Sequence, residues 1–383
     1  MRVAIVGVGQ TPFARNSRMS IQELCFEAFR DTLEDINLSP KEIEASIICS
    51  APEYDKQRSP AGLISEYLGL TPRPTLCAES LCSSSSTGVR VGYGFLKSRL
   101  HEIVVVIGFQ KMSEISSSEA QERMGRGADI QWESPFGTMM PAGYAMFARA
   151  HMHKYGTTDE QLAKVKVKSS KYALSNPLAM FRREVTLEDC LKARDIASPL
   201  KMYDCCANAD GASCVIMASE EKARKITTVP IWIAGIGAAS DTLATPNRTN
   251  ITGLDCAIQA GKQAYNMAGV EPKDIDVAEV HDCFTIAEIM AYENLGFCKS
   301  GEGGKLIDES QTYIGGKIPV NVDGGLLSKG HPIGATGGSQ IRTIVHQLQG
   351  RAGKTQIDGA EIGLIHNIGG VGLYGNVTIL KRE

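Results

Sequence analysis

Cys82 has the surroundings in this sequence that most favour a reactive side chain. Four serines, Ser83 to Ser86, follow it and can cap the helix predicted beyond them. A thiol at the start of a helix faces unpaired amide N–H groups and the positive end of the helix dipole, which stabilise a thiolate. The same amides can bind the oxyanion of an attacked thioester. We therefore expect a nucleophile here, the alternative being a buried structural cysteine.

His331 stands at the start of a second predicted helix, in the segment GHPIGATGG. The flanking glycines let the backbone approach a ligand closely and leave the ring open to a cleft. A histidine can take the proton from a thiol and return it later. A capping or surface histidine is the alternative for this position.

His281 and Cys283 share the segment HDCF, directly after a predicted strand at 277–280. The carboxyl ends of strands are the edge of an open α/β sheet where sites collect. His366, in HNIGG, is predicted to lie in the turn of the last hairpin, where its ring or amides could face the same cleft. The remaining histidines are expected to be solvated: His101, His151, His153 and His346.

Alternating strands and helices must position these residues. Residues 3–7, 45–50 and 102–109 have the apolar composition of strands, and 21–36 has the apolar spacing of a helix. Strands that are apolar on both faces and separated by helices predict a parallel α/β sheet covered on both sides.

The pattern changes between about residues 112 and 200, where polar and methionine-rich stretches predict a helical insertion over the sheet. Residues 213–218 return to the strand pattern. A second strand–helix series starts near 228, with a helix at 255–269, and the chain finishes in a predicted antiparallel hairpin. In the first half a helix begins just after Cys82, and in the second half a helix begins just after His331. This shared plan indicates an internal duplication.

Composition limits the classes of function. A length of 383 residues suits two domains, and a net charge of −3 gives no reason to expect nucleic acid or a membrane surface as partner. None of the eleven cysteines is in a C-x-x-C pair, so no metal site is expected, and the thiols are typical of a reduced, cytoplasmic protein. We find no signal peptide, no membrane-spanning run, and no phosphate or dinucleotide loop.

Four motifs taken together carry a family resemblance. ESLCSSS, AEVHDCF, SKGHPIGATG and GLIHNIGG, in this order, resemble the thiolase superfamily, and most closely its sterol-carrier-protein-type and archaeal-type branches. The resemblance covers essentially the whole chain. It implies a five-layered αβαβα fold of two similar halves, residues 1–227 and 228–383, with a loop domain at about 112–200 inserted in the first half.

The resemblance also implies roles for the site residues. Cys82 corresponds to the nucleophile that becomes acylated, and His331 to the residue that activates it. His281 stands where many thiolases have an asparagine that holds a water in an oxyanion hole. His366 stands where many have a second catalytic cysteine, and Cys283 takes over that acid/base task in the sterol-carrier-type branch. Coenzyme A is implied as a substrate, with no metal and no permanently bound cofactor; no individual CoA contact can be named.

The acyl group and the partners stay open at this stage. Serines after Cys82 replace the small residues of many thiolases, and Met139, Met140 and Met146 could line a roomy apolar pocket. This allows a bulky or aromatic substrate of the benzoylsuccinyl-CoA type, with acetoacetyl-CoA (an acetyl-CoA C-acetyltransferase) as the alternative. The resemblance further implies a homodimer or homotetramer and a small OB-fold, zinc-binding partner protein.

Two rival functions remain at the level of the sequence. A decarboxylating ketosynthase shares the fold and uses one cysteine with two histidines, but Cys283 has no place in such a site. A non-catalytic, thiolase-like scaffold subunit is the other rival, and the intact set of Cys82, His281, Cys283 and His331 argues against it.

Overall fold

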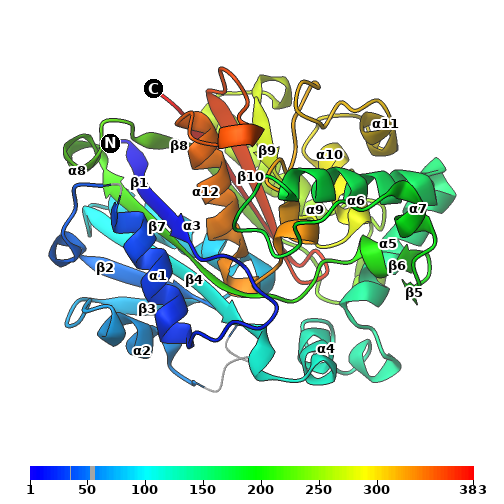
Figure 1. Cartoon of the computed structure of the whole chain (residues 1–383), viewed down its shortest axis with the longest axis horizontal. Coiled ribbons are helices and arrows are strands. Elements are labelled where there is room, and N and C mark those ends of the chain that lie inside the picture. Colours follow the sequence, from blue (N-terminus) through cyan, green and yellow to red (C-terminus); the bar gives the residue numbers. More distant parts are fainter. Residues whose placement is uncertain (35, 52–56) are drawn as a thin grey trace.

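A continuous sheet of nine strands is the frame of the molecule (Figure 1). The computed structural model describes residues 1–34, 36–51 and 57–383. The strands of the sheet are β1 (Val3–Gln10), β2 (Ala45–Cys49), β3 (Thr75–Ala78), β4 (Ile103–Lys111), β7 (Asp210–Ser219), β8 (Ile231–Ser240), β9 (Val277–Glu279), β10 (Ile362–Gly369) and β11 (Tyr374–Lys381). They hydrogen-bond in the order β3-β2-β4-β7-β1-β8-β11-β10-β9.

Twelve α-helices are described in the same ranges. They are α1 (Ile21–Glu34), α2 (Pro60–Tyr67), α3 (Ser84–Lys97), α4 (Ser117–Gly125), α5 (Met140–Tyr155), α6 (Asp159–Ala173), α7 (Leu187–Leu191), α8 (Glu220–Ile226), α9 (Asp255–Ala268), α10 (Thr285–Asn294), α11 (Gly303–Asp308) and α12 (Thr336–Leu348). The helix predicted at 21–36 ends at Glu34, and residue 35 lies outside the described residues. None of these helices meets the length and hydropathy needed to cross a bilayer.

The sheet is weakly joined at its middle, where β1 and β8 pair only through Ala4 with Trp232 and Ile5 with Ile231. The two parts of the sheet on either side of this joint enclose α3 and α12, and Figure 1 shows α12 between them. A core of apolar side chains from β1, β2, β4, β9, β10, α3 and α12 fills this middle space. Separate cores lie under α1 on one outer face and under α9 and α10 on the other. These five layers confirm the αβαβα architecture that the resemblance implies.

The prediction of a parallel sheet is wrong for much of the frame. β2 runs parallel to β3 and β4, but β7 is antiparallel to both β4 and β1, and β11 is antiparallel to β8 and β10. A buried strand is apolar on both faces in either direction, so its composition did not reveal its direction. The predicted hairpin of β10 and β11 is confirmed.

The starts of α3 and α12 meet in the middle layer, and the serine run belongs to this contact. The predicted capping role of the serines is wrong, because Ser83 makes no side-chain cap bond. Instead, the hydroxyl of Ser85 accepts a hydrogen bond from the Gly338 amide at 3.0 Å, and Ser86 donates to the Asn367 side chain at 2.9 Å. A Cβ atom on Gly337 would lie 2.2 Å from the Ser86 hydroxyl, so the approach needs a glycine there.

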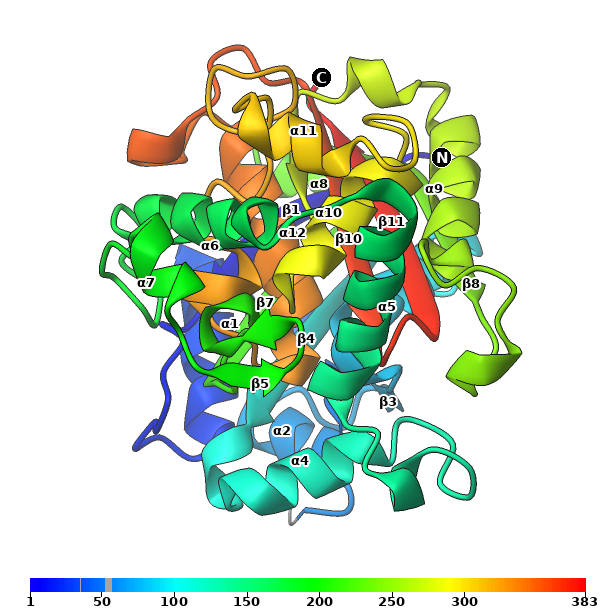
Figure 2. The ribbon, with the colours of Figure 1, turned by 90° about the vertical axis from the view of Figure 1, so that its right-hand side faces the viewer.

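Between β4 and β7 the chain leaves the sheet and forms α4 to α7 with a small two-stranded sheet of β5 (Asp195–Ala197) and β6 (Leu200–Lys201). Figure 2 shows α5 and α6 in front of the second half of the molecule. These helices pack on α10 and α11 and share an apolar core with the loop before α12. The division expected at residue 227 falls in the connection between α8 and β8.

Candidate active site

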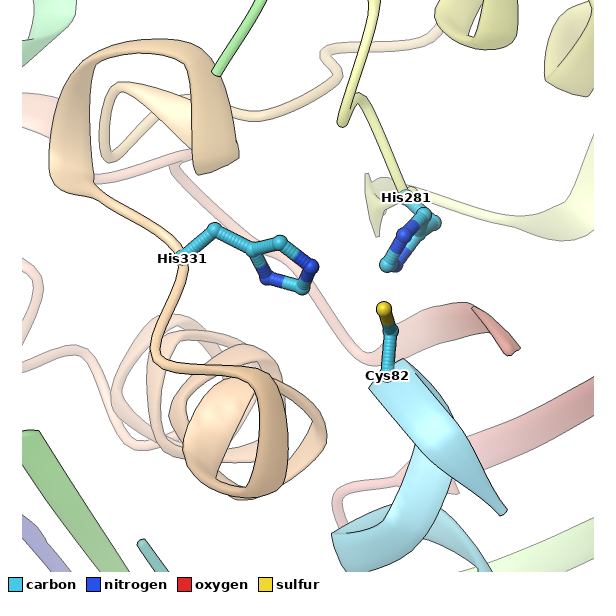
Figure 3. Close-up of side chains that lie close together, drawn as sticks. All are labelled: Cys82, His281 and His331. Atoms are coloured by element: carbon cyan, nitrogen blue, oxygen red, sulfur yellow. The ribbon is translucent and has the colours of Figure 1, made fainter. Parts of the chain in front are cut away.

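Cys82 lies in a single 3₁₀ turn, Leu81–Ser83, that leads directly into α3. Leu81 has a φ of 55°, a left-handed conformation that costs a leucine free energy and that the surrounding contacts must maintain. The Glu79 side chain supplies one such contact, accepting a hydrogen bond from the Leu81 amide at 2.6 Å. The sharp turn points the half-buried thiol of Cys82 toward two histidine rings (Figure 3).

His331 lies just before α12, and its hydrogen bonds fix which ring nitrogen carries the proton. Its Nδ1 is 2.7 Å from the hydroxyl of Thr336, and that hydroxyl donates to the Pro332 carbonyl at 3.0 Å. Since a hydroxyl has one proton to donate, Nδ1–H must be the donor to Thr336. Nε2 therefore has a lone pair and no hydrogen-bond partner among the described residues. Burial lowers the pKa of His331 to about 4, so the ring is neutral at pH 7 and can accept a proton.

His281, in the loop after β9, has the opposite tautomer. Its Nδ1 is 3.0 Å from the side-chain amide nitrogen of Asn367, whose oxygen already accepts from Ser86. The amide nitrogen can only donate, so Nδ1 accepts and Nε2 carries the proton. Burial, and then the nearby His331 and His366, lower the pKa of His281 well below its usual value. This ring is a neutral hydrogen-bond donor toward the cleft.

The three groups converge on one point. One ligand atom each of Cys82, His281 and His331 lies within 4.8 Å of the others, and the two rings meet edge to face at 5.2 Å between centroids (Figure 3). A thiol next to a base and a separate N–H donor is an arrangement for nucleophilic attack on a carbonyl. A zinc ion would need a lone pair from each histidine, and the proton on His281 Nε2 does not fit that requirement.

Cys283 is buried in the wall of the same cleft, two residues after His281. Burial raises the pKa of its thiol well above the usual value, so it remains protonated at neutral pH. The phenol of Tyr144, from α5, donates a hydrogen bond to the Gly370 carbonyl at 3.2 Å, and its interaction with the Cys283 thiol opposes the effect of burial on the pKa of that thiol. Tyr144 is itself fixed by stacking on Phe284, with ring centroids 4.6 Å apart. Cys283 is thus a thiol in a defined position that can deliver a proton.

Two expectations for histidines are corrected by the structure. His366 lies within β10, paired with Val377, and not in the hairpin turn. Side chains alternate along a strand, so Asn367 contacts His281 while His366 points to the other face and does not line the cleft. His151, expected to be solvated, is completely buried between the Thr157 hydroxyl at 2.7 Å and the Glu293 carboxylate at 3.1 Å.

The cleft is a cavity of about 680 Å³ that contains the thiols and both rings. Its walls are mainly apolar, with cations at several places and no aspartate or glutamate among the described lining residues. Met140, but neither Met139 nor Met146, belongs to this lining; Met146 instead lines a more open groove of about 880 Å³ on the outer side of α5. The lining includes Met124, Met140, Met180, Phe181, Met202, Tyr203, Arg15, Lys166, Arg183 and Arg194.

Sequence reasoning missed three residues that set the chemistry: Tyr144, Thr336 and Asn367. Thr336 lies in the motif SKGHPIGATG, five residues after His331, and Asn367 lies in GLIHNIGG, one residue after His366. A motif does not say which hydroxyl or amide contacts which ring. Tyr144 comes from the inserted segment, whose docking on the second half cannot be inferred from local patterns.

Known proteins show similarity over the whole chain. The family described as thiolase, N-terminal domain, matches residues 3–221, and the thiolase C-terminal domain-like family matches residues 237–382. The acetyl-CoA acetyltransferase of Methanothermobacter thermautotrophicus is 40% identical over 99% of both chains. Sterol carrier protein 2 of Oryctolagus cuniculus is 33% identical over 99% of this chain and 72% of its own. Among solved structures, the Ltp2-ChsH2(DUF35) aldolase has a TM-score of 0.87 and 28% identity, covering 100% of this chain and 98% of that chain.

Proposed function

This chain belongs to the thiolase family, and from that premise we propose that it cleaves or forms 3-oxoacyl-CoA through an acyl-Cys82 intermediate. The family matches confirm the resemblance inferred from the four motifs. The observation that carries the proposal is the convergence of Cys82, His281 and His331, one ligand atom of each lying within 4.8 Å of the others, with a lone pair on His331 Nε2 and a proton on His281 Nε2. One thiol, one base and one oxyanion donor are the groups that acyl transfer requires.

In the first half-reaction of thiolysis, His331 Nε2 accepts the Cys82 proton and the thiolate attacks the 3-oxo carbon. The bond between C2 and C3 then breaks, which leaves the acyl group on Cys82 and an enolate of the shorter acyl-CoA. The Cys283 thiol donates its proton to C2 of this enolate. The N–H of His281 lies where negative charge develops on an oxygen next to the reacting thiol.

In the second half-reaction, the thiol of free CoA gives its proton to the Cys283 thiolate. The CoA thiolate attacks the acyl-Cys82 thioester, and Cys82 leaves and recovers its proton from His331. Protons and electrons balance over the cycle without a metal or a redox cofactor. Synthesis is the reverse sequence, in which Cys283 removes the α-proton.

Two acyl classes have support. The cavity of about 680 Å³ with methionines in its walls supports a bulky acyl group, the benzoylsuccinyl-CoA type included. The relative that is 40% identical and named acetyl-CoA acetyltransferase supports acetoacetyl-CoA. A matched series of esters separates the two classes.

We also propose partner proteins for the assembled enzyme. The similarity to a complex named with a DUF35 component supports a small partner protein, for which the OB-fold, zinc-binding type is our expectation. A homodimer or homotetramer is the expected state of the chain itself. Size-exclusion chromatography with light scattering, with and without proteins that co-purify from the native source, tests both.

The proposal is tested by mass spectrometry of both products from short, long, branched and aromatic 3-oxoacyl-CoA esters. Cleavage should require CoA and should vanish in Cys82→Ala, and wild-type Cys82 should gain the mass of the acyl group when CoA is withheld. Cleavage that needs no CoA would point to aldolase chemistry instead. Unchanged activity of an assembled complex containing Cys82→Ala would establish the non-catalytic scaffold alternative.

A further inference from the structure

Lys166, on α6, is a buried cation in the wall of the catalytic cleft. Its side chain is 4% exposed, and its ammonium donates to the Leu327 carbonyl at 2.7 Å and to the Ser328 hydroxyl at 2.9 Å. Both partners belong to the π-helical turn Gly325–Lys329, which directly precedes the loop containing His331. The ammonium is therefore buried in the wall of the cleft, against the turn that leads to His331.

The two hydrogen-bond partners of Lys166 are neutral, which distinguishes it from the other buried lysines. Lys168, two residues later on α6, pairs with Glu288 at 2.5 Å, and Lys329 pairs with Asp323. Among the described residues no carboxylate forms an ion pair with Lys166; the nearby carboxyl of Asp282 raises the pKa of Lys166, but it accepts hydrogen bonds from the Leu326 and Leu327 amides and does not line the cavity. A buried charge without a counter-ion is costly, so a fold retains one where something else compensates it.

A second cation adds to the positive charge on the same wall of the cavity. Arg183 also lines the cavity, and its guanidinium hydrogen-bonds to the phenol of Tyr203. The charge of Arg183 contributes to lowering the pKa of Lys166, after burial as the main cause, to about 8. Two cations that disfavour each other, in a cavity without a described acidic side chain, form a site for an anionic group of a ligand.

The position favours the acyl part of the substrate over the phosphates of CoA as the source of that anion. Lys166 lines the same cavity as Cys206, Cys283 and the proposed nucleophile Cys82. The three arginines of the lining, Arg15, Arg183 and Arg194, are exposed, so Lys166 is the buried cation among the described lining residues; of the three arginines, Arg183 is the one whose charge acts on Lys166. An acyl group held on Cys82 would occupy the cavity that Lys166 also lines.

We propose that Lys166, assisted by Arg183, binds a carboxylate on the acyl group, so that the substrates are CoA thioesters of 3-oxo dicarboxylic acids. This inference rests on the proposed thiolase function. A lysine–carboxylate contact inside a cleft is a charge-assisted hydrogen bond that a neutral acyl group cannot make. It selects among substrates without taking part in bond breaking.

The test compares two esters of the same chain: the CoA thioester of a 3-oxo dicarboxylic acid and that of its ω-methyl ester. Wild type should prefer the charged ester in kcat/KM, and Lys166→Met should reduce this preference by about 10- to 100-fold. Lys171→Met, which removes an exposed lysine of the same helix, should leave the preference unchanged. Lys166→Gln retains a donor for Leu327 and Ser328, and it should show the same loss if the fold of the Met variant is disturbed.

Binding of the two esters to Cys82→Ala, with and without Lys166→Met, separates this inference from the proposed function. If wild type cleaves neither ester but the charged one binds more tightly through Lys166, the proposed function fails and the carboxylate site stands. If both esters are cleaved and Lys166→Met reduces them equally, the lysine serves CoA or the fold, and the inference is overturned.

Discussion

At the scale of single residues, the chemistry depends on proton placement in two neutral imidazoles. His331 presents a lone pair because Thr336 accepts from its Nδ1, and His281 presents an N–H because Asn367 donates to its Nδ1. In the proposed mechanism, two rings with centroids 5.2 Å apart thus have different roles, one as base and one as oxyanion donor. The difference between the two rings is set by Thr336 and Asn367, which do not contact the substrate, so substitutions at these two residues test it.

Thr336→Val should lower kcat more than it raises KM. The isosteric change removes the acceptor for His331 Nδ1–H, so the ring loses both its tautomer preference and its orientation. We expect a loss of about 10- to 100-fold in kcat, with the acid limb of the pH profile of kcat/KM displaced. Thr336→Ser keeps the hydroxyl and should recover most of the activity. Equal loss in both variants would mean that the methyl group, and not the hydrogen bond, is what matters.

His366 should make the fold sensitive to acid. Burial lowers its pKa to about 3, so the unfolded chain, with a pKa near 6.5, binds a proton that the folded chain does not. The stability that depends on this neutral ring is fully present above pH 6.5 and is lost as the pH falls toward 3. Lowering the pH from 7.5 to 5.0 should therefore reduce the free energy of unfolding by about 2 kcal/mol through this ring. His366→Phe should not show this part of the loss.

The measurement is the free energy of unfolding in urea at both pH values. His153→Phe, at an exposed position, serves as the matched control and should lose as much stability as wild type. An acid loss that is identical in His366→Phe and wild type would show that this ring does not contribute.

At the scale of elements, the site depends on how the first turns of α3 and α12 cross. Ser85 in α3 accepts the Gly338 amide hydrogen of α12, and both groups are buried. Ser85→Ala should therefore destabilise the protein by about 1–3 kcal/mol, because the amide loses its partner without access to water. Ser98→Ala, at the exposed end of α3, removes a hydroxyl bond to the Phe95 carbonyl and should cost less than half as much. Urea unfolding at pH 7.5 compares them, and equal losses would contradict the argument.

The contact between α3 and α12 shows which features could be predicted from the sequence and which could not. The helix starts after Cys82 and His331 could be predicted, because a polar residue followed by small residues and an apolar period marks such a start. The serine run was misinterpreted as a cap, because local rules do not include a second helix that approaches from 253 residues away. The direction of the strands and the position of Tyr144 on α5 could not be predicted for the same reason, because each depends on contacts between distant segments. Cys82, His281, Cys283 and His331 do converge as their motifs led us to expect.

At the scale of the whole molecule, the cleft joins segments that lie far apart in the sequence. Cys82 comes from the start of α3, whereas His281, Cys283 and His331 come from the loops after β9 and before α12. The inserted segment closes the remaining side through α5 and α6, and it brings Tyr144 and Lys166. The proposed nucleophile and the proposed acid/base thus come from different parts of the chain, and each can be substituted without the other.

Cys283→Ala should uncouple carbon–carbon cleavage from acyl transfer. Breaking the C2–C3 bond generates an enolate that needs the Cys283 proton, so cleavage should fall by about 100- to 10,000-fold. Exchange of labelled CoA into an acyl-CoA forms no enolate. Cys283 only exchanges a proton with the CoA thiol there, and a thiol is already ionised to about a few per cent at pH 7, so exchange should fall less than about tenfold. Cys206→Ala, at another thiol of the cleft, should affect neither reaction strongly. If Cys283→Ala slows exchange as much as cleavage, then Cys283 shapes the cleft as a whole and another group supplies the proton.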